Sequence, residues 1–138
     1  MEIILAVVVI SIIIGGIMPL FSVIHRFRTD CEAVLLCQRL KYVREISSEA
    51  DAFATVPGRK YEGIPRIYIA QDNHRYWYRR GNKIIKKWDY GTDINISCNR
   101  PEIFFYRNGE ATAGTYTIYS GNKIRRVIID RVGRIRIE

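Results

Sequence analysis

The sequence has 138 residues, which limits the chain to one compact domain of about 100 residues plus a terminal element. Its 22 Lys and Arg outnumber 14 Asp and Glu, for a formal net charge of +8. This balance favours an anionic partner, either a nucleic acid or a lipid or wall surface. A soluble basic surface without a ligand carries equal weight.

An uncharged apolar run opens the chain. Residues 3–24 carry no formal charge, and as a helix they span about 33 Å, close to the hydrocarbon thickness of a bilayer. A cleaved signal peptide would have an apolar core of about 7–15 residues, a basic start and a small-residue cleavage site. None of these fits, so we predict a retained transmembrane and assembly helix over residues 1–25.

Helical periodicity continues after the apolar run, over residues 26–56. Apolar residues recur there at spacings of three, four and seven, and polar residues fill much of the opposite face. The apolar stripe comprises Ala33, Leu36, Cys37, Leu40, Val43, Ala50 and Phe53. We therefore predict one helix from about residue 2 to 54, with an amphipathic second half, that ends at Pro57-Gly58.

Residues 57–138 form the third part, in which the period changes to two. Eight segments there are typical of short strands: PRIYIA, RYWYRR, KIIKKW, INIS, EIFFY, TYTIYS, IRRVIID and RIRIE. The turn signals between them include Gly81-Asn82, Asn108-Gly109 and Gly121-Asn122. Because every connection is short, we expect an antiparallel meander of hairpins packed on the amphipathic half, an α+β fold.

The order of these parts resembles a type IV pilin or pseudopilin, in which a long helix, apolar and then amphipathic, carries a C-terminal antiparallel sheet. Mature members have a glutamate near the start of the apolar run and a proline 17 residues later. Glu2 and Pro19 have this spacing. The resemblance implies a pilin-like fold, other pilin or pseudopilin subunits as partners, and a single-pass protein of a bacterial cell membrane whose C-terminal domain lies outside, in a cell-surface filament.

The start of the sequence departs from the family pattern, which has a basic leader and a glycine before the cleavage point. The resemblance implies processing by prepilin peptidase. The positive-inside rule alone would place His25, Arg26 and Arg28 in the cytoplasm. We discount the rule here because the leader normally supplies basic residues on the inner side.

The carboxylate of Glu2 admits two interpretations. In assembled pilins the corresponding glutamate is thought to pair with the N-terminal amine of a neighbouring subunit, since a carboxylate among apolar helices is costly without a compensating charge. The local alternative is an interfacial glutamate at a helix N-terminus, stabilised by the macrodipole. The spacing to Pro19 favours the assembly role.

The last hairpins resemble the GspH/FimT group of minor pseudopilins over roughly residues 102–138. In that group a terminal Gly-Arg-x-Arg motif has been linked to DNA uptake, and Gly133, Arg134 and Arg136 match it. The candidate DNA-binding residues of this stretch are Lys123, Arg125, Arg126, Arg131, Arg134 and Arg136. Guanidinium groups match phosphate oxygens without reading sequence. The alternatives are an arginine ladder paired with carboxylates of adjacent strands, or a subunit contact at the filament tip.

A second basic stretch covers residues 74–88, with six Lys and Arg and no acid. Arg79, Arg80, Lys86 and Lys87 are its candidate DNA-binding residues. Interleaved aromatic side chains are typical of grooves that stack single-stranded nucleic acid, but alternate aromatics of a hairpin usually face a core. We expect about half of these aromatics in the core, with Trp77 packed beside Ile84 or Ile85.

Signals for an enzyme, a metal or another cofactor are absent from the sequence. His25 and His74 lie far apart, and no catalytic triad order, metal-ligand spacing or phosphate-binding loop occurs. Cys31 and Cys37 are too far apart on a helix to bond each other. Cys98 could reach one of them, but we expect three buried free cysteines.

Two functions follow from the resemblance. The first is a minor pilin of a type IV pilus or competence filament, whose basic sheet binds extracellular double-stranded DNA for uptake. The second is a minor pseudopilin of a type II secretion-like filament that contacts protein partners at the filament tip.

Overall fold

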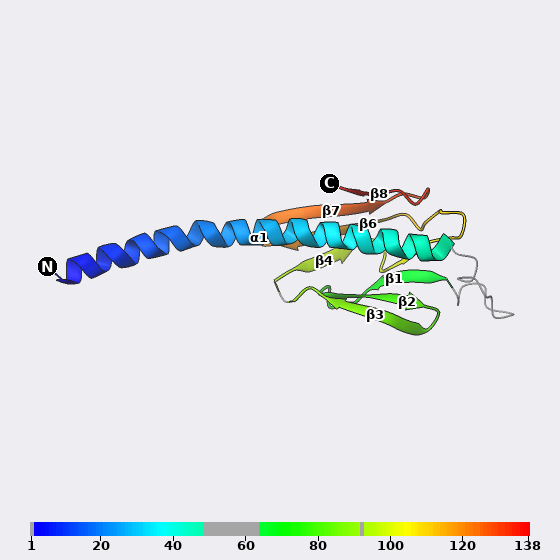
Figure 1. Ribbon diagram of the computed structural model, residues 1–138, viewed down its shortest axis with the longest axis horizontal. Helices are drawn as coiled ribbons and strands as arrows, with labels where there is room; N and C mark the ends of the chain where they lie inside the picture. Colours follow the sequence, from blue (N-terminus) through cyan, green and yellow to red (C-terminus); the bar gives the residue numbers. More distant parts are fainter. Residues whose placement is uncertain (1, 49–63, 92) are drawn as a thin grey trace.

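The computed structural model describes residues 2–48, 64–91 and 93–138. It contains one long helix and two four-stranded sheets (Figure 1). All strand pairs are antiparallel. The α+β fold class, with a long N-terminal helix packed against antiparallel strands, is therefore confirmed.

The helix α1 (Glu2–Ser48) is continuous through Pro19. Proline removes only one hydrogen bond from a helix interior, and α1 keeps a gentle curve over its length (Figure 1). The predicted end near residue 54 and the stop at Pro57-Gly58 lie outside the described residues.

The two halves of α1 differ in burial. The helix is long and apolar enough to cross a membrane, and none of the 18-residue apolar stretch in its first half is buried. In the second half the predicted apolar stripe is buried as far as it is described: Ala33, Leu36, Cys37, Leu40 and Val43 are at most 7% exposed. Ala50 and Phe53 lie outside the described residues. The amphipathic prediction is confirmed for the part of the helix that contacts strands.

Every predicted strand segment contains a strand. These are β1 (Pro65–Ile69), β2 (Arg75–Arg80), β3 (Lys83–Asp89), β4 (Asn95–Cys98), β5 (Glu102–Phe104), β6 (Gly114–Ser120), β7 (Lys123–Ile129) and β8 (Ile135–Ile137). The first sheet has the order β3-β2-β1-β5 and the second the order β4-β6-β7-β8.

The expected single meander is wrong. β1 to β3 and β6 to β8 are meanders, but β4 and β5 do not pair with each other: β4 joins β6, and β5 returns to β1. The connection between them ends at Pro101, which has no N–H to donate and restricts Arg100 to extended conformations. The carbonyl of Pro101 instead accepts from the Ile69 N–H at 2.8 Å. The chain therefore passes from the second sheet to the first.

The predicted core aromatics of the second basic stretch are half right. Tyr76 and Tyr78 are buried, whereas Trp77 is only half-buried, and Ile84 and Ile85 are 39% and 49% exposed. Alternation along β2 places Tyr76 and Tyr78 on the core side and Trp77 on the other. The predicted packing of Trp77 with Ile84 or Ile85 in the core is therefore wrong, because Tyr76 and Tyr78, and not Trp77, occupy the face of β2 that points to the core.

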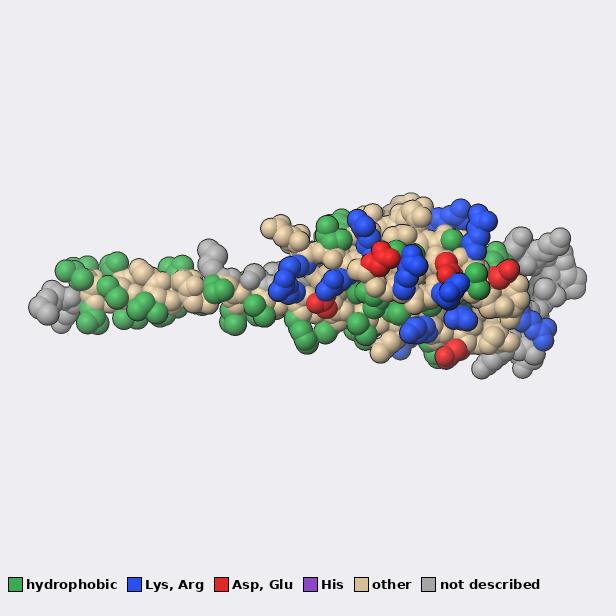
Figure 2. All heavy atoms as spheres, turned by 90° about the horizontal axis from the view of Figure 1, so that it is seen from above, with side chains coloured by type: hydrophobic (Ala, Val, Ile, Leu, Met, Phe, Trp, Pro, Cys, Tyr) green, Lys and Arg blue, Asp and Glu red, His purple; other side chains and the backbone are tan. Residues whose placement is uncertain are grey.

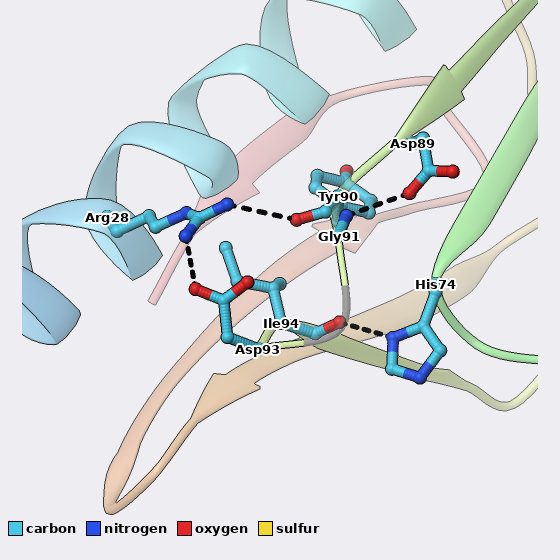
Figure 3. Close-up of polar contacts among 7 residues, drawn as sticks. All are labelled: Arg28, His74, Asp89, Tyr90, Gly91, Asp93 and Ile94. Carbon is cyan, nitrogen blue, oxygen red and sulfur yellow. Dashed lines mark hydrogen bonds and ion pairs between the residues drawn. The ribbon is translucent and has the colours of Figure 1, made fainter.

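Both sheets are attached to α1 close to the end of its apolar run. Arg28 forms an ion pair with Asp93 and donates to the Tyr90 carbonyl at 3.2 Å, which holds the loop between β3 and β4 (Figure 3). On the second sheet, Arg125 of β7 forms an ion pair with Asp30. The helix thus contacts strands of both sheets, and its buried stripe forms their common core.

Candidate functional site

The basic residues of the C-terminal stretch separate along β7. Arg125 pairs with Asp30, which lowers the pKa of that carboxyl. Lys123 lies nearby, in a cavity that Arg26 also lines. Arg126 is exposed and points to the opposite side of the sheet from Val127, which is buried in the core. The stretch is therefore not one continuous patch.

A second group of cations comes together at the other end of the second sheet. Two adjoining cavities of about 510 and 470 Å³ share Lys41 and Arg44 of α1. We call the cations around them the cationic hollow: Lys41, Arg44, Arg107, Arg134 and Arg136. A helix, the loop after β5 and the C-terminal strand all contribute to it.

Gly133 fixes where the C-terminal strand meets this hollow. Its φ is +77°, a conformation that glycine adopts without strain. A Cβ at this position would lie 2.0 Å from the Gly109 carbonyl oxygen and 3.6 Å from Nε of Arg44. The glycine of the Gly-Arg-x-Arg motif thus allows two turns to pack together beside Arg44, and Arg134 follows directly.

Side chains alternate between the two faces along the terminal strand. Ile135 lies opposite Ile129 and packs against the core, whereas Arg136 lies opposite Ile128. Arg134 and Arg136 therefore project away from the core side.

Part of the charge in the cationic hollow is paired locally. Arg134 lies 3.3 Å from Asp130, and Arg136 lies 3.2 Å from Glu138. Both arginine side chains remain largely exposed, at 79% and 65%, so these pairs are weak and open to competition. Among the described residues, no carboxylate forms an ion pair with Lys41, Arg44 or Arg107. The hollow thus has an excess of cations, five against the two carboxylates Glu45 and Asp130 that also line its cavities, and its guanidinium groups suit phosphate or carboxylate groups.

Sequence reasoning missed three members of this hollow. Lys41 and Arg44 are three residues apart on the polar side of α1, a spacing that places side chains on one helix face. This spacing could have indicated that Lys41 and Arg44 lie together, but only the tertiary fold shows that β8 lies beside them. Nothing in the sequence connects Arg107 with these residues.

The second basic stretch is divided between the two sides of the first sheet. Lys86 lies over the Trp88 ring at 5.7 Å and lines a groove of about 450 Å³ between α1 and β3. Lys87 lies opposite Trp77 on the other side. Arg79 lies over the Tyr68 ring at 5.9 Å, and Tyr68 contacts Trp77. Arg80 is exposed at the end of β2.

The remaining candidate residues lie apart from both basic groups. Arg131 is exposed in the turn between β7 and β8 and lines neither cavity of the hollow. Glu2 is the first residue of α1, and Pro19 lies within the exposed apolar half. Figure 2 shows this division of the molecule: hydrophobic side chains follow the first half of α1, and Lys and Arg side chains, with some carboxylates, are spread among hydrophobic and other side chains over the rest of the visible face.

The cysteines are unpaired thiols, of which only Cys37 is buried, while Cys31 and Cys98 are half-buried. The expectation of three buried cysteines is therefore wrong for two of them. Burial raises the pKa of the Cys98 thiol, which keeps it protonated at neutral pH. In the part of the chain that the structure describes, no group of three metal-binding side chains comes together.

Comparison with known proteins identifies a fold. No protein-family model and no curated protein matches the sequence. Two solved structures of the minor pseudopilin EpsH from the type 2 secretion system of Vibrio cholerae are similar to the chain, with TM-scores of 0.59 and 0.60 at 16% and 14% identity. The matches cover 80% and 81% of this chain, and 96% and 94% of those chains. The expected pilin-like fold, of the kind found in the GspH group, is thereby confirmed.

Proposed function

We propose that the chain is a minor pseudopilin, held in a membrane by residues 3–24 before it joins a type II secretion-like filament and contacts protein partners at the filament tip. The observation that carries this proposal is the pseudopilin-like fold combined with a fully exposed apolar helix half. An apolar surface of that size needs either lipid or the helices of neighbouring subunits as its environment.

Substitution of Glu2 tests the assembly step separately from the membrane step. Glu2→Ala leaves the apolar run intact, so the variant should remain in the membrane fraction. It should fail to enter filaments, because it lacks the carboxylate that would compensate a neighbouring subunit's amine. Membrane fractionation and recovery of the chain in sheared filaments measure the two steps.

Glu110→Ala is the matched control, since Glu110 is an exposed carboxylate in the loop before β6. It should behave as wild type in both measurements. Normal incorporation of Glu2→Ala into filaments would overturn the assembly role of Glu2.

A second candidate function is the capture of double-stranded DNA by a pilus-type or competence filament. The observation that favours it is the cationic hollow, in which Arg134 and Arg136 of the Gly-Arg-x-Arg motif lie beside two cations of α1. Phosphate contacts of this kind bind DNA of any sequence. With three to five phosphates neutralised, log affinity should fall against log salt with a slope of about −3 to −4.

Combined substitution of the motif arginines tests DNA capture. Arg134→Ala with Arg136→Ala should flatten the salt slope of the full chain by about one to two units, measured by fluorescence anisotropy with duplex DNA in detergent micelles. Lys86→Ala with Lys87→Ala removes the same charge from β3 and should leave the slope unchanged. If the folded motif variant binds DNA as tightly as wild type, DNA capture by these arginines is overturned and the protein-partner function is the one that stands.

A further inference from the structure

A basic cavity lies at the end of the sheets that meets the apolar half of α1. It has a volume of about 600 Å³ and is formed by the start of the second helix half and the turn between β6 and β7. We call it the membrane-end hollow; its lining residues are Arg26, Asp30, Asn122, Lys123, Ile124 and Arg125. In Figure 1 the β6–β7 turn is at the side of the sheets that faces the N-terminal half of the helix.

The position of this hollow along α1 corresponds to the headgroup layer of a bilayer. The polar layer on each side of the hydrocarbon is roughly 5–8 Å thick. With the apolar run ending at Ile24 and a rise of about 1.5 Å per residue, Arg26 is about 3 Å and Asp30 about 9 Å beyond the hydrocarbon, for a helix along the membrane normal. Arg26 thus lies within this layer and Asp30 just beyond its outer edge.

The ion pair of Arg125 with Asp30 fixes β7 at the same height. β7 runs in the same direction as α1 (Figure 1), so Lys123 lies two residues nearer the membrane than Arg125. Two residues of a strand correspond to about 7 Å. Lys123 and Arg26 thus lie at about the same depth, in agreement with their common cavity.

The charges of the hollow are unbalanced. Its lining includes three cations but one carboxylate, Asp30, which Arg125 already engages. Among the described residues, Arg26 and Lys123 form no ion pair with a carboxylate. An anion of small size, such as a phosphate, fits a cavity with these two cations at its edge.

Apolar side chains beside these cations fit a lipid better than a soluble anion. Ile124, at the start of β7, is 56% exposed, and Phe27, next to Arg26, is 71% exposed. Residues of this kind are stabilised at the boundary between headgroups and acyl chains, while Lys and Arg extend to the phosphates. Continuity with the apolar run places both at that boundary.

We propose that the membrane-end hollow binds the phosphate groups of anionic phospholipids in the bilayer that carries the anchor. This inference depends on the membrane anchoring proposed above. It gives Arg26 and Lys123 a function distinct from DNA capture. β7 has seven residues and spans about 20 Å, so these two side chains lie far from the cationic hollow, at a depth where the bilayer excludes a duplex.

The test compares two double variants of the full chain in lipid nanodiscs. Electron paramagnetic resonance with spin-labelled phosphatidylglycerol or phosphatidylcholine gives the relative association of each lipid with the protein. Wild type should prefer phosphatidylglycerol. In the Arg26→Ala, Lys123→Ala variant this preference should fall about fivefold for each charge removed. Arg134→Ala with Arg136→Ala is the matched control, with the same charge loss at the far end of the sheet, and should keep the preference.

Two further measurements separate the possible failures. Flotation of wild type with vesicles of neutral phosphatidylcholine tests the anchor alone, and its absence would overturn anchoring. If the chain floats but shows no preference for phosphatidylglycerol, or if both double variants lower the preference equally, the lipid site is overturned while the anchor stands. High salt should abolish the wild-type preference by screening, a result that needs no variant and is independent of folding.

Discussion

The two basic stretches, residues 74–88 and 121–138, each contain six Lys and Arg side chains, but the fold uses them differently. In residues 74–88 the cations belong to two neighbouring strands, and Arg79 and Lys86 contact aromatic rings on opposite sides of one sheet. In residues 121–138 the cations divide between the two ends of the β7–β8 hairpin, and each end gains cations from α1. The same number of cations in the sequence is therefore distributed differently in space.

The difference arises from what lies beside each strand pair. The β2–β3 hairpin meets α1 through Arg39, which donates to the Tyr76 hydroxyl and lies over the Trp88 ring at 4.9 Å. The guanidinium group of Arg39 is thus stabilised by aromatic side chains. Beside β8, Lys41 and Arg44 instead share a cavity with Arg134, Arg136 and one carboxylate, Asp130, and a bound anion would relieve the remaining excess of positive charge.

The largest expected effect concerns the turn that places β8. Gly133→Ala should destabilise the soluble part by about 3 kcal/mol, because a Cβ is strained at positive φ and overlaps the Gly109 carbonyl. Thermal unfolding followed by circular dichroism should show a fall in Tm of roughly 10 °C or more.

Gly121→Ala provides the control for that substitution. Gly121 also has a positive φ, of +55°, but no atom lies within 4 Å of its added Cβ. The variant should therefore lose only about 1 kcal/mol. Equal losses in the two variants would show that the contact between Gly133 and Gly109 contributes nothing.

The sequence predicted the parts of the molecule that depend on local periodicity. The stripe from Ala33 to Val43 and all eight strands followed from spacings of 3.6 and 2 residues, and the turn at Gly121-Asn122 followed from its residue types. The division into two sheets did not follow, because it depends on partners far apart in the chain, such as Ile67 with Ile103.

The candidate site was predicted in part for the same reason. Arg134 and Arg136 were found through a motif, but their neighbours Lys41 and Arg44 lie about 90 residues earlier and become adjacent only when β8 packs beside α1. Conversely, Lys123 and Arg125 belonged to one charge run with the motif, yet the length of β7 separates them from it. A run of charged residues along a strand shows which side chains share a face of the sheet, but it does not show that they form one surface patch.

A smaller effect is expected from one member of the hollow. Arg44→Gln should reduce the salt slope of DNA binding by about one unit, because one phosphate contact is lost. Lys87→Gln removes the same charge from the basic stretch at residues 74–88 and should leave the slope unchanged. The same anisotropy titrations measure both. If Lys87→Gln lowers the slope and Arg44→Gln does not, residues 74–88 form the DNA-binding surface and the comparison is reversed.

The smallest expected effect concerns the ion pair that holds β7 on α1. The side chains of Asp30 and Arg125 are 41% and 46% exposed, so solvent screens their attraction. A double-mutant cycle with Asp30→Asn and Arg125→Gln should give a coupling of about 0.2–1 kcal/mol at low salt, measured from thermal unfolding of the full chain in micelles. At about 1 M salt the coupling should vanish, since the screening length falls to about 3 Å. A coupling above about 2 kcal/mol that persists in salt would mean that this pair is shielded from solvent, and Arg125 would then be a structural link rather than part of an accessible basic surface.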